Sequence, residues 1–179
     1  MFYAFGFDQL GVVLSDLYFV DPDPKPGQEG PERGARLEVR LFDRPEPDGS
    51  VYAARPIGVG RPVWRADLLE SVASAPGSFD RTHHHPRFRG WEPGRRTFEP
   101  ELSADPVTWV GQRLGDVDAL LAGADLPDVD VSEAERAELK AAIPDIEGAL
   151  RRILDRVHAG ELAQAPAGGP VAAARTGWL

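Results

Sequence analysis

Hydrophobic residues change their spacing once along this chain, and that change divides it into two parts. Between residues 35 and 42 apolar and charged side chains alternate, so that Leu37, Val39 and Leu41 share one face. A period of two is typical of a strand with one buried face. After residue 105 the apolar residues recur every three or four positions, as they do along one side of a helix. We therefore expect strands first and helices after them.

Other segments of the first hundred residues are also rich in aromatic and β-branched residues and are separated by turns. The segments predicted as strands are 2–7, 11–20, 35–42, 50–54, 63–72, 81–88 and 95–98. Pro86 has no backbone N–H, so it would confine its strand to an edge of the sheet. Because short turns join consecutive strands, the pattern favours an antiparallel sheet.

Helix-start signals appear in the last third of the chain. Asp105 before Pro106 is typical of an N-cap, and Ser132 with Glu135 predicts a capping box. Pro144 is expected to break or kink the second helix and begin a third segment. The sequence thus predicts an α+β fold in which an antiparallel β-sheet (residues 1–100) packs against two or three C-terminal α-helices.

A chain of 179 residues fits one ordinary domain. We expect a single α+β domain over residues 1–162, with the sheet in 1–104 and the helices in 105–162. Residues 163–179 are rich in Ala, Gly and Pro and are expected to form a flexible tail. Trp178 is the exception, because a tryptophan there is a candidate for docking onto the domain.

Composition excludes several classes of site and location. The chain has no cysteine, which excludes disulfides, thiolate metal sites and cysteine nucleophiles. No apolar run approaches the roughly 20 residues of a membrane-spanning helix, and no secretory signal is visible, so we expect a cytoplasmic protein without membrane contact. The net charge of −9 argues against nucleic-acid binding by the whole surface.

Three consecutive histidines form the most distinctive polar motif of the chain. In an extended strand His83 and His85 share one face, while His84 points the opposite way. Neutral imidazoles at that spacing are candidate ligands for one divalent metal ion, and Asp80 and Asp67 are the nearest acids in sequence for a third position. Histidines are also general acids and bases near neutral pH. A structural or surface role for the tract is the alternative.

Arg65 and Asp67 lie on one face of the predicted 63–72 strand. They can pair with each other, which would position the guanidinium for a phosphate or carboxylate group, or serve only as a structural ion pair. If this strand neighbours the histidine strand, the parts of a phosphodiester-cleaving site come together. His83, His85 and Asp67 are then the candidate catalytic residues.

Residues 81–98 hold five arginines and a single acid, Glu92, on this acidic protein. Several of these arginines alternate with Phe88, Trp91 and Phe98, a composition typical of single-stranded nucleic-acid platforms and also of exposed amphipathic strands. Arg65, Arg87 and Arg89 are therefore candidate phosphate-binding or nucleic-acid-binding residues. Nucleic acid is expected only through this strip.

The segments 2–7, 14–22, 62–69 and 79–86 resemble an uncharacterised family of actinobacterial cytosolic proteins, a likeness that covers most of residues 1–121. That resemblance implies no activity. The chain is also faintly similar to TumE-type toxin proteins of toxin–antitoxin modules, in which a strand ending in Arg-x-Asp precedes a His-rich tract. The residues that match are Arg65, Asp67, His83, His84, His85 and Pro86.

Two functions fit these observations. The first is a non-catalytic interaction or regulatory module with a protein partner or a second copy of itself, whose signature would be an exposed apolar patch or an unpaired sheet edge. The second is a small hydrolase, in the manner of a ribonuclease, with or without one divalent metal ion. It requires Arg65, Asp67 and two histidines to converge in a cleft.

Overall fold

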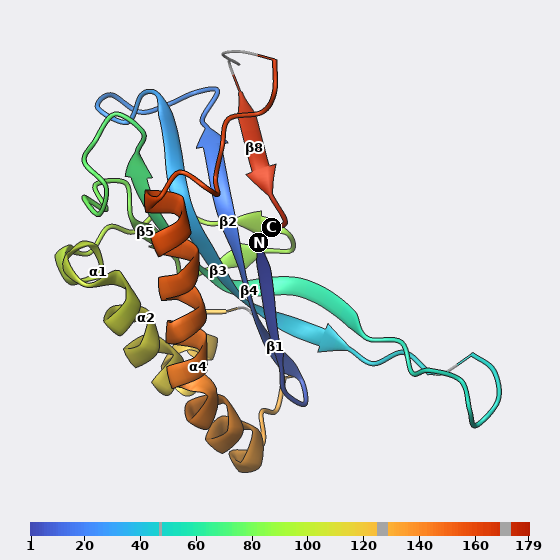
Figure 1. The fold of residues 1–179 in the computed structure, drawn as a ribbon. Coiled ribbons are helices and arrows are strands. Elements are labelled where there is room, and N and C mark those ends of the chain that lie inside the picture. Colours follow the sequence, from blue (N-terminus) through green and yellow to red (C-terminus); the bar gives the residue numbers. More distant parts are fainter. Residues whose placement is uncertain (47, 125–128, 169–172) are drawn as a thin grey trace.

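The computed structural model describes residues 1–46, 48–124, 129–168 and 173–179. Its centre is an antiparallel sheet in which five consecutive strands lie in chain order (Figure 1). These strands are β1 (Phe2–Gly6), β2 (Leu10–Val20), β3 (Pro31–Asp43), β4 (Gly58–Ser71) and β5 (His83–His85). The predicted α+β class with an antiparallel sheet is confirmed.

The described residues form four helices, which lie on one side of the sheet (Figure 1). They are α1 (Pro100–Ala104), α2 (Pro106–Gly115), α3 (Val117–Ala122) and α4 (Glu133–His158). Both predicted helix starts are confirmed, because Asp105 accepts a hydrogen bond from the Thr108 amide and Ser132 accepts one from the Glu135 amide. The Glu135 side chain does not complete the predicted capping box, since its carboxylate accepts from the Gln9 and Leu10 amides. Within the described residues, no helix combines the length and the apolar character needed to cross a membrane.

The predicted break at Pro144 is wrong, since α4 runs through it for 26 residues. A proline inside a helix removes one backbone hydrogen bond. Apolar residues on both sides of it, among them Leu139, Ile146 and Leu150, are fully buried in the common core. Their packing holds the two halves of the helix on the sheet.

Three strand predictions also need correction. Residues 95–98 form no strand, and only Thr97 makes an isolated bridge, to His84. Residues 50–54 form turns in place of a strand, and Val51 and Tyr52 are 94% exposed, so nothing packs there to hold a strand. Only His83–His85 of the predicted 81–88 strand joins the main sheet, at its edge. The chain then leaves the sheet at Pro86 and forms a separate hairpin of β6 (Phe88–Arg89) and β7 (Glu92–Pro93).

A strand lies where the sequence predicted a flexible tail. β8 (Ala174–Gly177) pairs antiparallel with Leu17–Val20 of β2, next to β1. The following Trp178 amide donates a hydrogen bond to Ser15 Oγ over 3.1 Å. Gly177 permits this approach, because a Cβ atom there would lie 2.5 Å from the Asp16 carbonyl oxygen. Edge pairing, which composition does not reveal, therefore orders this part of the tail.

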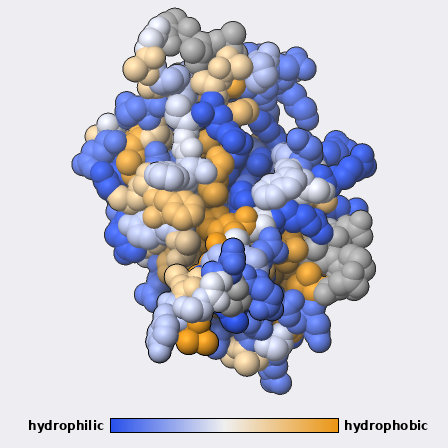
Figure 2. All heavy atoms as spheres, turned by 90° about the vertical axis from the view of Figure 1, so that its right-hand side faces the viewer, coloured by the Kyte–Doolittle hydropathy of each residue, from blue (hydrophilic) through white to orange (hydrophobic). Residues whose placement is uncertain are grey.

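The two faces of the sheet differ in chemistry. Leu37 and Val39 of β3, with Ala66 and Leu68 of β4, belong to the apolar core under the helices. The residues between them in sequence point to the opposite face and are mostly charged. On the side seen in Figure 2, away from the helices, hydrophilic side chains predominate and hydrophobic ones gather in a central band. The functional candidates lie on this polar face.

Candidate functional site

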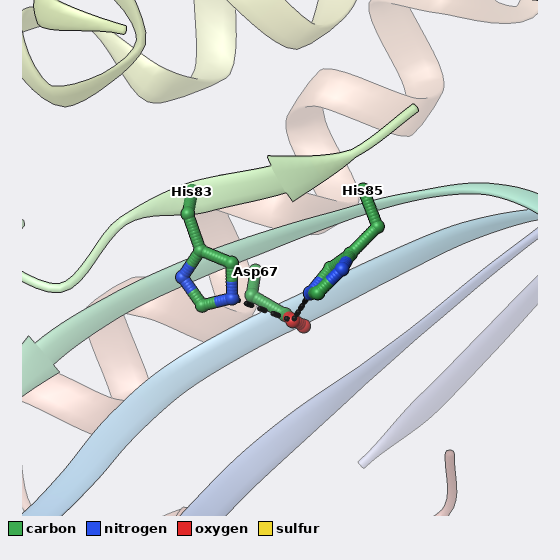
Figure 3. A group of neighbouring side chains, drawn as sticks. All are labelled: Asp67, His83 and His85. Atoms are coloured by element: carbon green, nitrogen blue, oxygen red, sulfur yellow. Dashed lines mark ion pairs between the residues drawn. The ribbon is translucent and has the colours of Figure 1, made fainter. Parts of the chain in front are cut away.

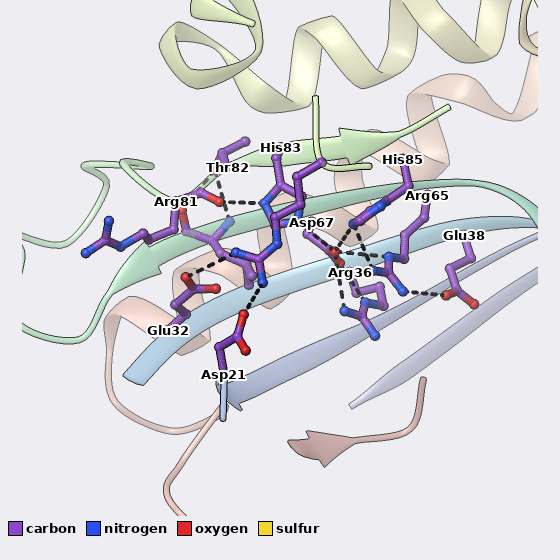
Figure 4. Close-up of polar contacts among 12 residues, drawn as sticks. Asp21, Glu32, Arg36, Glu38, Arg65, Asp67, Arg81, Thr82, His83 and His85 are labelled. Carbon is purple, nitrogen blue, oxygen red and sulfur yellow. Dashed lines mark hydrogen bonds and ion pairs between the residues drawn. The ribbon is translucent and has the colours of Figure 1, made fainter. Parts of the chain in front are cut away.

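Strand register brings the predicted site residues together. Asp67 of β4 lies directly opposite His83 of β5, and Arg65 lies opposite His85. On the other side of β4, Asp67 faces Arg36 of β3. Because directly opposite residues project from the same face of a sheet, all five side chains meet above β4 (Figure 4). The two strands whose adjacency the site required are neighbours.

Asp67 is the centre of this cluster. Its carboxylate is 1% exposed and is held by Arg36, with Nε to Oδ1 at 2.6 Å and Nη2 to Oδ2 at 3.3 Å. Arg65 Nε forms a second ion pair with Oδ2 at 3.0 Å. Burial alone would raise the pKa of Asp67, but the guanidiniums of Arg36 and Arg65, together with the hydrogen bond from His83, hold it well below its usual value. Asp67 is therefore a permanent anion inside the site.

His83 and His85 both point their Nε2 atoms at Asp67 Oδ2, at 3.3 and 3.5 Å (Figure 3). Their Nδ1 atoms lie 2.8 Å from the carbonyl oxygens of Arg81 and Gly94, respectively. A carbonyl only accepts, so both Nδ1 atoms must carry the hydrogen. The orientation of both rings is thus fixed by backbone.

The second nitrogen distinguishes the two histidines. His85 Nε2 lies 2.9 Å from Arg65 Nη2, and because arginine only donates, this nitrogen accepts and the ring is neutral. Burial first, and then the charge of Arg65, lower the pKa of His85. The ring nitrogens of His83, in contrast, both face acceptor oxygens, those of the Arg81 carbonyl and the Asp67 carboxylate.

His84 lies on the other face, as strand alternation predicts. Its Nε2 is 3.0 Å from Glu99 Oε1, and its ring packs against Trp64 and Trp109. Burial lowers the pKa of His84, opposed by Glu99. This histidine belongs to the packing between sheet and helices and takes no part in the site.

A cavity of about 580 Å³ opens over the cluster. One wall is the β6–β7 hairpin with Trp91, and the other is the segment after β8 with Trp178. The charged residues that line it are Glu32, Arg36, Glu38, Arg40, Arg65, Asp67, Glu92, Arg96 and Arg175. Five arginine and four carboxylate side chains line this cavity, on a protein whose net charge is −9.

Most of these charges are paired within the protein. Arg40 Nε donates to Glu38 Oε2 at 2.7 Å, and Arg96 Nη2 lies 3.1 Å from Asp21 Oδ2. Glu32 differs in its hydrogen bonding, because neither of its buried oxygens has a hydrogen-bond partner among the described residues, although Arg96 lies 3.9 Å from Oε1. Burial raises the pKa of Glu32, and Arg96 opposes that effect. The cavity is thus lined by one buried carboxyl group, that of Glu32, without a hydrogen-bond donor.

Arg87 and Arg89, the other candidate phosphate-binding or nucleic-acid-binding residues, do not line the histidine cavity. Both line a separate hollow of about 700 Å³ beside the β6–β7 hairpin. Of the other arginines in the 81–98 strip, Arg96 does reach the cavity.

Asp67, His83 and His85 also form a group that could hold a metal ion, since each offers a ligand atom within 4.8 Å of the others. Backbone carbonyls that fix both Nδ1–H groups are typical of metal-binding histidines. The arginines work against a metal, because Arg65 occupies His85 Nε2 and two guanidiniums occupy Asp67. A divalent ion would have to displace one cation and sit beside the other.

The sequence did not identify Glu32, Arg36 and Glu38 as part of the site. Alternation did place Arg36 and Glu38 on the polar face of β3, but it predicted a solvent-exposed face. The structure buries them, with 5% and 3% exposure, under the hairpin and the C-terminal segment. The available signal was the number of charged residues on β3, namely Arg36, Glu38 and Arg40, next to a strand that carries Arg65 and Asp67.

Comparison of the chain with protein-family models, with curated proteins and with solved structures finds no match in any of the three. The geometry of the cavity is therefore the basis for a functional proposal.

Proposed function

We propose that this protein binds an anionic ligand in the cavity over Asp67, as a non-catalytic recognition module. The observation that carries the proposal is that His83 and His85 have protein partners on both ring nitrogens, while arginines surround them. Histidines with these contacts help to hold Asp67 and Arg65 in position at the base of the cavity. Preorganised arginines are well suited to phosphate and carboxylate groups.

The arginines are arranged for binding in two tiers. Arg36 and Arg65 lie at the bottom, 7% and 11% exposed, where a ligand anion would be shielded from water. Arg175 on β8 lies at the mouth, is exposed, and has no ion pair or hydrogen bond of its side chain within the described part of the chain. An available guanidinium at the entrance would attract and hold an anion.

Calorimetric titration with inorganic phosphate and with pyrophosphate tests the proposal. We expect saturable binding of one anion per chain that weakens as salt is added. Arg175→Ala should weaken it about tenfold, the effect of losing one charge-assisted hydrogen bond. Lys140→Ala removes the same charge from α4 and should leave binding unchanged. Absence of saturable binding by either anion would contradict the proposal.

Hydrolysis of phosphodiesters is a second candidate, favoured by the convergence of Arg65, Asp67, His83 and His85 that it requires. To act on a substrate, one histidine must release Asp67 or Arg65 and turn its Nε2 to the phosphorus centre. Turnover of a phosphodiester by the purified protein, lost in the His83→Ala/His85→Ala double variant, would support this candidate over simple binding.

The role of a protein partner or of a second copy stays a prediction.

A further inference from the structure

The four tryptophans of this chain fall into two groups. Trp64 and Trp109 are 3% and 6% exposed and stack in the core, with ring centroids 6.2 Å apart. Trp91 and Trp178 are 62% and 75% exposed, and both line the cavity over Asp67. Two large exposed aromatic rings at the mouth of one cavity are unusual, because a tryptophan in water forgoes the stabilisation it would gain from burial.

Both exposed rings are held in place by neighbours. The Arg40 guanidinium lies over Trp91, 5.6 Å from its ring centroid, and the Phe2 ring lies 6.0 Å from Trp178. The Trp178 backbone is tied to Ser15 of β2. Preorganised rings lose little entropy on binding, so they are suited to a planar group that stacks on them.

Glu32 adds an independent requirement. Its side chain is 2% exposed and lines the cavity, and its nearest cation, Arg96, is 3.9 Å away, beyond hydrogen-bond distance. A buried carboxylate without a donor is costly, and such groups normally find a partner. A ligand in this cavity that carries hydrogen-bond donors could satisfy Glu32, whereas a bare phosphate dianion offers it none.

We propose that the ligand is a ribonucleotide, with its phosphate on the arginines, its ribose hydroxyls on Glu32 and its base against Trp91 and Trp178. This inference rests on the proposed anion binding and names the ligand class. Carboxylates that accept hydrogen bonds from ribose hydroxyls are a recurring means of nucleotide recognition. The cavity of about 580 Å³ is within the usual range for small-molecule sites.

Simpler ligands leave part of the site unused. A sugar phosphate satisfies the arginines and Glu32 but places nothing on the two tryptophans. A deoxyribonucleotide offers the base and the phosphate but one hydroxyl fewer to Glu32. Comparing these compounds therefore tests each part of the proposal separately.

The experiment is calorimetric titration of the full chain with AMP, GMP, dAMP, ribose 5-phosphate and inorganic phosphate. We expect AMP or GMP to bind about tenfold more tightly than ribose 5-phosphate, because only the nucleotides stack a base. AMP should also bind about tenfold more tightly than dAMP, because the 2′-hydroxyl donates to Glu32. Quenching of tryptophan fluorescence should accompany nucleotide binding only.

Variants assign these differences to residues. Trp91→Ala and Trp178→Ala should each bring AMP affinity close to that of ribose 5-phosphate, and Glu32→Gln should reduce the preference for AMP over dAMP. Tyr52→Ala is the matched control, since Tyr52 is 94% exposed and does not line the cavity. Circular dichroism establishes that each variant is folded before it is titrated.

The outcomes separate this inference from the anion binding beneath it. If phosphate or ribose 5-phosphate binds as tightly as AMP and GMP, the ribonucleotide assignment is overturned while anion binding stands. If inorganic phosphate, pyrophosphate and all nucleotides fail to bind, both are overturned.

Discussion

Arg65 Nη2 donates to His85 Nε2 over 2.9 Å, and this single contact decides the chemical state of the histidine. Arginine has no acceptor atom, so His85 must present a lone pair to it while its Nδ1–H donates to the Gly94 carbonyl. The lone pair that would bind a metal or remove a proton is already in use. Arg65 therefore prevents His85 Nε2 from binding a metal ion or removing a proton as long as this contact persists.

Removal of Arg65 is expected to create a metal site. In Arg65→Ala, Asp67 Oδ2 and the Nε2 atoms of His83 and His85 lose a competing cation but stay within reach of one ion. We expect the variant to bind one Zn²⁺ per chain, while the wild-type protein purified without an affinity tag holds substoichiometric metal. Elemental analysis and zinc titration measure both quantities.

Arg87→Ala is the control for that experiment, since it removes an arginine outside the cavity and should leave zinc binding at the wild-type level. The His83→Ala/His85→Ala double variant should bind none at this site. One equivalent of metal in the wild-type protein, lost in the double variant, would show that the arginines do not exclude the ion.

Strand periodicity was sufficient to predict which side chains of the Asp67 cluster share a face on each strand. A period of two separates His83 and His85 from His84 and puts Arg65 on the same face as Asp67, and the structure has both arrangements. Their adjacency across β4 and β5 was not predictable, because pairing depends on how the chain between Ser71 and His83 turns back. That turn is stabilised by Asp80, which accepts hydrogen bonds from the Ser71 amide and the Ser74 hydroxyl.

Other errors have a common physical origin in tertiary contacts. Pro144 breaks helices by local rules, but burial on both sides keeps α4 continuous. Residues 163–179 lack a local pattern, yet an open edge of β2 accepts β8. Arg87 and Arg89 line a hollow separate from the histidine cavity, because the chain leaves the main sheet at Pro86. Their role as phosphate-binding or nucleic-acid-binding residues stays a prediction.

Asp67→Asn is expected to destabilise the protein strongly. The substitution leaves Arg36 and Arg65 buried without their counter-charge, and loss of one partner of a buried ion pair costs about 3–5 kcal/mol. Urea denaturation measures the free energy of unfolding. Asp118→Asn is the comparison, because Asp118 is 72% exposed in its pair with Arg136 and should cost at most about 1 kcal/mol. Equal losses in the two variants would contradict this account of the cluster.

Neutral burial of His85 predicts a pH dependence of stability. Its pKa is lowered in the folded protein, so as pH falls through about 6.5 the unfolded chain takes up a proton that the folded protein does not. The contribution of His85 is complete above that pH and is lost toward the lowered folded value, with a slope of at most about 1.4 kcal/mol per pH unit.

His85→Gln isolates this contribution, since glutamine can still accept from Arg65 and does not titrate. Urea denaturation at several values between pH 5 and 8 should give a shallower slope for the variant than for the wild type. A slope that is equal in both, or steeper in the variant, would mean that His85 is protonated in the folded protein.

Glu32→Gln is expected to stabilise the free protein at alkaline pH. The raised pKa of Glu32 means that its contribution to stability is present below about 4.5, the value in the unfolded chain, and is lost as pH rises through the folded value. Glutamine removes a buried charge that has no hydrogen-bond donor, so we expect a gain of about 1 kcal/mol in unfolding free energy at pH 8 and little difference at pH 4.

Glu101→Gln, at an exposed position on α1, provides the matched control and should change neither value. A buried residue whose replacement stabilises the fold is typical of a binding site, where stability is given up for recognition. If Glu32→Gln instead destabilises the protein at pH 8, the carboxylate is already satisfied within the fold. A ligand would then have no unmet hydrogen bond to fill at Glu32, and the ribose contact would lose its physical basis.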